Sequence, residues 1–87
     1  MRAIITVVGK DKVGILAAVA TSCAQANANV VDVSQTVMDD YFTMTMMIEI
    51  DDLNTDFETM KQAVSQAVPE MQVHIMHENI FNSMHRI

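Results

Sequence analysis

The chain has 87 residues and a formal net charge of −6, and 51% of its residues are hydrophobic while only 5% are aromatic. This length predicts a single domain over residues 1–87, with an aliphatic core rich in methionine. The acidic balance argues against a nucleic-acid partner, because binding to a phosphate backbone normally needs a basic stripe. One cysteine cannot form an internal disulfide, and no apolar run approaches about 18 residues. The sequence therefore predicts a complete cytoplasmic protein without a signal peptide or a membrane span.

The first predicted element is an apolar, β-branched strand over Arg2–Val8. Both of its faces are largely apolar, which indicates a place in the middle of a sheet. The loop that follows contains both glycines of the chain, Gly9 and Gly14. Glycine is used where the backbone needs a positive φ or a close approach. Asp11 in this loop can cap the next helix. The alternative is a pocket of amides at the helix N-terminus, which favours carboxylates and other anions.

Apolar residues at helical spacing predict a helix over Gly14–Ala26, and the sequence Asn27-Ala28-Asn29 ends it. A strand is predicted over Val30–Met38. The pair Asp39-Asp40 is typical of a hairpin turn. It leads into the clearest strand of the chain, Tyr41–Ile50, in which five large apolar side chains face one way. The preceding strand shows the same alternation, with three valines on its apolar face: Val31, Val33 and Val37.

The second half of the chain begins with Thr55-Asp56-Phe57-Glu58. This segment has the pattern of a capping box, in which the threonine is the N-cap and the glutamate lies three residues later. The helix that it opens is expected to end at Pro69. A last strand is predicted over Met71–Met76, and the tail Glu78–Ile87 is predicted to include a short helical turn.

The resulting order, βαββαβ, predicts an α+β ferredoxin-like sandwich. Both helices follow a strand, so right-handed crossovers place them on the same face of the sheet. The expected order of the four antiparallel strands is 4-1-3-2, with Arg2–Val8 and Tyr41–Ile50 as the central pair. The opposite face is then uncovered, and an exposed apolar patch usually marks an interface. We therefore expect a homodimer, with a single-domain monomer as the alternative. The apolar residues of this face are Ile4, Val8, Met38, Met47 and Met76.

The order of elements, the loop from Gly9 to Leu16 and the pair Asn29-Val30 together resemble an ACT domain. Two further segments, residues 32–44 and 80–87, resemble more specifically a family of small, stand-alone ACT proteins without an assigned function. The resemblance covers essentially the whole chain. It implies a regulatory fold and not an enzyme. It also implies that two subunits pair side by side or face to face and bind an amino acid or a similar small ligand at their interface.

The resemblance also implies where such a ligand binds. The strand-to-helix loop of one subunit meets the start of the second strand of another subunit. Asp11 and Asn29 stand at the polar positions that contact the ligand in many ACT domains. Two residues depart from the family pattern: Val13 replaces a common proline, and Gly9 stands where some serine-binding members have a histidine. These departures weaken the case for serine-type recognition.

The residue types in this loop, apart from the resemblance, also indicate that the loop binds a ligand. The backbone amides near Gly14 would hold a ligand carboxylate, and the Asp11 side chain would pair with an ammonium group. No metal or other cofactor is expected: His74 and His77 are three apart on a strand, so they point to opposite faces and lack other ligands at a suitable spacing. The predicted ligand-binding residues are Asp11, Lys12, Val13, Gly14, Ile15 and Asn29.

Two other functions remain open. One is a pure assembly module that pairs with an enzyme or another regulator and binds no small molecule. The other is an acylphosphatase-like hydrolase, which uses the same fold. That activity needs an arginine in the first loop and an asparagine on the central strand, whereas this loop has Lys10 and Lys12 and the strand Tyr41–Ile50 has no asparagine.

Overall fold

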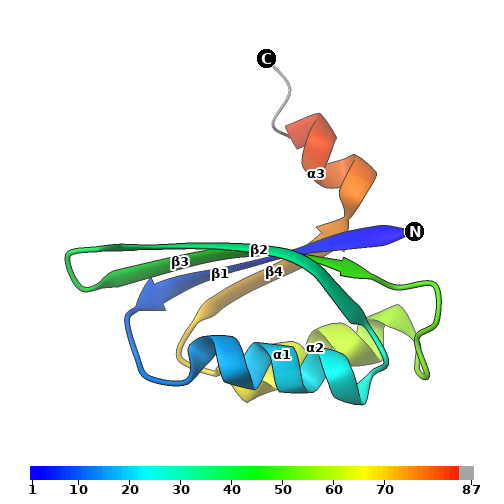
Figure 1. Cartoon of the computed structure of the whole chain (residues 1–87), viewed down its shortest axis with the longest axis horizontal. Helices are drawn as coiled ribbons and strands as arrows, with labels where there is room; N and C mark the ends of the chain where they lie inside the picture. The colour runs from blue at the N-terminus through cyan, green and yellow to red at the C-terminus, as the bar shows by residue number, and fades with distance from the viewer. Residues whose placement is uncertain (85–87) are drawn as a thin grey trace.

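The computed structural model of the chain describes residues 1–84, which form one four-stranded antiparallel sheet with two helices on one face (Figure 1). The strand order β2-β3-β1-β4 is the predicted order read from the other edge, so the predicted ferredoxin-like sandwich is confirmed. The elements are β1 (Arg2–Lys10), α1 (Ile15–Gln25), β2 (Asn29–Met38), β3 (Tyr41–Glu49), α2 (Phe57–Ala67), β4 (Gln72–His77) and α3 (Glu78–Met84).

The core lies between the central strands and the two long helices. β1 and β3 are paired along their whole lengths, from Arg2 opposite Glu49 to Lys10 opposite Tyr41, as the apolar faces of both strands predict. α1 covers this face with a stripe that includes Val19 and Cys23, and α2 contributes Met60 and Val64. Methionine is flexible and fills irregular gaps, which suits a core with few aromatic rings. The fully buried residues of the two central strands are Ala3, Ile5, Val7, Met44, Met46 and Ile48.

At Gly9 the end of the Met71 side chain packs against the backbone of β1. A Cβ atom at Gly9 would lie 2.7 Å from Sδ of Met71, which is closer than real Cβ atoms come to other heavy atoms. The close contact at Gly9 is thus with a side chain, while the Met71 Cα atom would lie at an ordinary distance of 3.5 Å from a Cβ atom. Of the two glycines, Gly14 is the one that has a positive φ.

Two local predictions are wrong by one residue. The N-cap of α2 is Asp56 and not Thr55, because Asp56 has an extended backbone and its carboxylate accepts a hydrogen bond of 3.0 Å from the Thr59 N–H. In β2, the predicted alternation fails at Val31. The pairing with β3 shifts register between Val30 and Asp32, so Val31 is the extra residue of a bulge and is exposed.

The opposite face of the sheet is not fully uncovered. The predicted helical turn in the tail is α3, which lies on the side of the sheet away from α1 and α2 and packs against β1 and β4 (Figure 1). Ile4 is only 2% exposed, so its predicted place in an exposed patch is wrong. Met47 and Met76 are half-buried, whereas Val8 is 42% and Met38 is 74% exposed. The exposed apolar residues of this face are thus those farthest from α3.

Candidate functional site

The loop between β1 and α1 ends at Gly14, which is the N-cap of α1. Gly14 has φ +89° and ψ 7°, in the left-handed region that favours glycine, and no side chain of the described residues caps the first turn of the helix. The predicted capping role of Asp11 is therefore wrong. Its backbone N–H donates a 2.8 Å hydrogen bond to the Asp40 carbonyl, which ties the loop to the β2–β3 turn. Within residues 1–84, the exposed Asp11 side chain makes no hydrogen bond or ion pair.

A cavity of about 160 Å³ lies beside the first turn of α1. Its second wall comes from the end of α2 and the turn that follows. Lys12 Nζ and Glu70 Oε1 form an ion pair of 2.8 Å between the two walls. The hydrogen bond from the Lys12 ammonium group lowers the pKa of the Glu70 carboxyl. Four predicted ligand residues line this cavity: Lys12, Val13, Gly14 and Ile15.

Glu70 is a residue that the sequence did not reveal. It lies 58 positions from Lys12, and the two side chains meet only because α2 ends beside the start of α1. The one available signal is the place of Glu70 directly after Pro69, in the turn that leads from α2 to β4. That signal indicates an exposed charge but not its partner.

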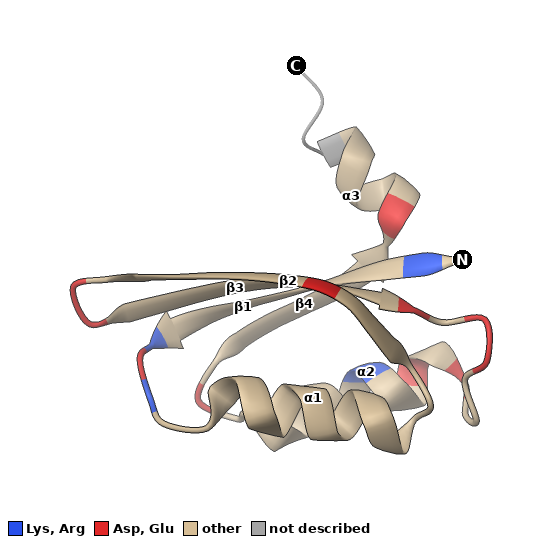
Figure 2. Cartoon of the chain, in the orientation of Figure 1, with Lys and Arg blue, Asp and Glu red and all other residues tan. Residues whose placement is uncertain are grey.

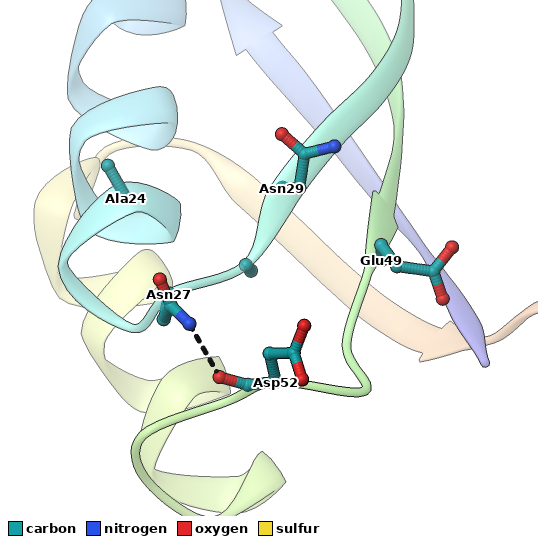
Figure 3. Close-up of a pocket in the computed structure, with 6 residues that line it drawn as sticks. Ala24, Asn27, Asn29, Glu49 and Asp52 are labelled. Carbon is teal, nitrogen blue, oxygen red and sulfur yellow. Dashed lines mark hydrogen bonds between the residues drawn. The ribbon is translucent and has the colours of Figure 1, made fainter.

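A second, larger cavity of about 330 Å³ lies at the other end of α1 (Figure 3). It is lined by Asn29 at the start of β2, by Glu49 at the end of β3 and by Asp52 in the following loop. Asn27, with φ +61°, donates a 2.8 Å hydrogen bond from Nδ2 to the Asp52 carbonyl. Within residues 1–84, the lining of this cavity includes carboxylates and amides but no lysine or arginine.

The predicted site residues therefore fall into two groups in one chain. Residues 11–15 precede α1 and Asn29 follows it, and a helix of 11 residues is about 16 Å long. A single chain does not bring Asp11 and Asn29 together. The arrangement that the ACT resemblance implies, in which the two groups meet across two subunits, stays a prediction.

Comparison with known proteins identifies the family. A family model described as the ACT domain matches residues 2–78. The chain belongs to the ACT domain family. It is 49% identical over 89 residues to a UPF0237 protein of Listeria innocua, with 100% of both chains covered. A UPF0237 protein of Methanocaldococcus jannaschii is 42% identical, with 99% of this chain and 98% of the relative covered.

The solved structures agree with this assignment. An ACT domain protein from Streptococcus pneumoniae is 42% identical to this chain, the match covers 93% of each chain, and the TM-score is 0.74. ACT domains are regulatory domains that bind ligands. The fold and the broad regulatory class of this ACT domain are thereby established.

His74 and His77 do not form a shared site. His74 is exposed and pairs with Thr6, whereas His77 lies on the helix-facing side opposite Ala3, as the strand periodicity predicts. The His77 ring stacks on Phe57 with 4.5 Å between ring centroids. In the part of the chain that the structure describes, no three His, Cys, Asp or Glu side chains are grouped to hold a metal ion. No helix among these residues is long and apolar enough to cross a membrane.

Proposed function

We propose that this ACT domain is a cytoplasmic, non-catalytic regulatory module that binds a small amino acid as a homodimer. The observation that carries the proposal is the uncapped first turn of α1 beside a cavity that Lys12 lines. The first N–H groups of a helix have no partner within the helix and favour anions, so this turn suits a ligand carboxylate. Asp11, which does not cap the helix, is left to contact an ammonium group.

The edge strand β2 supports a homodimer. It is ten residues long, almost entirely exposed, and contains neither lysine nor proline, the residues that commonly protect such an edge. Its exposed apolar side chains, Val30, Val31, Val37 and Met38, make this edge a better interface than the open face, which α3 partly covers. Acidic side chains lie mostly in turns and at strand ends, and β2 has one charge, Asp32 (Figure 2). Two acidic chains would therefore meet here with little repulsion.

The sheet register explains how a β2-to-β2 dimer would complete the site. Met38 and Lys10 both pair with Tyr41, so β2 ends at the same side of the sheet as β1 and the β1–α1 loop. A two-fold symmetric pair of β2 strands is antiparallel. Such a pair would bring the start of β2 in one chain, at Asn29, toward the β1–α1 loop of the second copy. The amides near Gly14 would then hold the carboxylate, and Asp11 and Asn29 would hold the rest of the amino acid.

A thermal-shift screen against the twenty amino acids tests the binding proposal. A ligand that binds only the folded state stabilises it by about 2.7 kcal/mol when its concentration is 100 times Kd. We expect one amino acid, or a small group of similar ones, to raise Tm in a concentration-dependent way. A screen in which no amino acid raises Tm would contradict amino-acid binding.

The β2 edge also favours a second candidate function. An exposed edge strand can accept an extended segment of a different protein, because main-chain hydrogen bonds give affinity in such complexes. In that case the chain is an assembly module that binds no small molecule. A chain that is monomeric alone, inert in the amino-acid screen and paired with a partner through β2 would favour this function.

A further inference from the structure

A carboxylate already sits at the cavity beside the start of α1. It belongs to Glu70, whose Oε1 atom lies 2.8 Å from Lys12 Nζ. Both side chains line the cavity together with Gly14 and Ile15. Among the described residues, Lys12 is the lysine that lines this cavity, and it is engaged by an internal carboxylate.

A ligand carboxylate can replace the Glu70 carboxylate in this ion pair. Both side chains are at least half exposed, and exposed ion pairs contribute little net stability because water solvates the separated charges nearly as well. Glu70 also lies in a turn, outside any helix or strand, so its side chain can leave without disturbing the sheet. A carboxylate held at the same time by helix N–H groups and by Lys12 would have more partners than Glu70 has.

We infer that Glu70 is an internal competitor at this site, and that a ligand carboxylate must displace it from Lys12 in order to bind. The inference rests on the proposed function and adds the ligand class to it. Once displaced, Glu70 remains tethered beside the cavity and repels a second negative charge. The site therefore takes a monocarboxylate with a neutral side chain in preference to a dicarboxylate.

Acetate is a suitable probe because it has a carboxylate and little else. Its binding is followed by the amide NMR shifts of Gly14, Ile15 and Leu16 in the full chain. We expect Glu70→Gln to bind acetate about two- to fivefold more tightly than the natural chain, the factor that corresponds to an exposed ion pair. Glu58→Gln is the matched control, because Glu58 forms an exposed pair with Lys61 on α2 and does not line the cavity.

The Lys12→Gln background separates displacement from general repulsion. If Glu70 acts by occupying Lys12, the gain in acetate affinity from Glu70→Gln should be smaller in the Lys12→Gln background, where only repulsion by the unpaired Glu70 carboxylate is left. A gain that is undiminished in this background, or equal acetate affinities in the natural chain and Glu70→Gln, would overturn the inference. Failure of acetate to shift these amides in any chain would overturn it as well. The amino-acid screen judges the proposed function separately, because it reports binding anywhere on the chain.

A preference experiment checks the ligand class. Succinate is expected to bind the natural chain more weakly than acetate does, and Glu70→Gln should narrow this difference. Succinate binding that equals or exceeds acetate binding in the natural chain would contradict the proposed selection for a single carboxylate.

Discussion

Replacing Gly14 by alanine should destabilise the fold through backbone conformation alone. Gly14 has a φ of +89°, which side chains of L residues rarely allow. A Cβ atom at this position would meet no heavy atom within 4 Å, so no collision adds to the cost. An L residue in the left-handed region costs roughly 1–2 kcal/mol. Gly14→Ala should therefore lower the free energy of unfolding by about 1–2 kcal/mol.

Urea denaturation followed by circular dichroism measures this change, with the slope of the transition expected to stay constant. Gly14→Asn is the matched control, because asparagine tolerates the left-handed region better than alanine and should lose less stability. Gly9→Ala gives the contrast: its Cβ would lie 2.7 Å from Met71 Sδ, so any loss of stability comes from displacing the flexible Met71 side chain and not from backbone conformation. The reasoning about Gly14 is refuted if the alanine variant is as stable as the natural chain, or if asparagine is no better than alanine.

Three further outcomes are expected. Asp56→Ala should lower the urea midpoint at pH 7, because the hydrogen bond from Thr59 lowers the pKa of the Asp56 carboxyl. The stability that the ionised Asp56 carboxyl contributes is fully present above the pKa that this carboxyl has in the unfolded chain. It is lost as pH falls through the lower pKa that the carboxyl has in the folded chain. The urea midpoints of Asp56→Ala and the natural chain should therefore converge in acid. Burial raises the pKa of the Cys23 thiol to about 11. At pH 8, Cys23 in the folded chain should therefore react with a disulfide reagent far more slowly than Cys23 in the unfolded chain. Equal reaction rates would contradict the burial of Cys23. The natural chain should sediment as the proposed dimer at micromolar concentration, and Val37→Lys should sediment as a 9.7 kDa monomer. Val37 is 54% exposed, so the substitution should have little effect on folding. A variant that remains dimeric would exclude the β2 edge as the interface.

The fold could be predicted because hydrophobic periodicity and the order of the elements leave few alternatives. Arg2–Val8 is apolar on both faces, and the structure places this strand in the centre of the sheet. The predictions that were wrong concern single residues. Thr55 and Asp56 are both good N-caps, and only the backbone conformation selects the second. The bulge at Val31 leaves no clear mark in a sequence of alternating valines.

The candidate site was predictable only in part, because it depends on contacts between distant segments. The two glycines mark the loop, and Gly14 has the backbone conformation that its residue type suggests. The partnership of Lys12 with Glu70 depends on how α2 ends beside α1, which no short pattern contains. The burial of Ile4 likewise depends on where α3 lies, and a seven-residue helix does not fix its own direction by sequence.

The central claim is that two copies of the chain share one amino-acid site, and subunit mixing tests it most directly. Asp11→Ala and Asn29→Ala are prepared separately, and each alone should bind the amino acid from the screen about tenfold more weakly. After the two variants are mixed and exchanged, half of the dimers contain one of each, and each mixed dimer has one site with both residues intact. Calorimetry should then detect about a quarter of the natural number of tight sites. A mixture that binds no better than the separate variants would contradict a shared site.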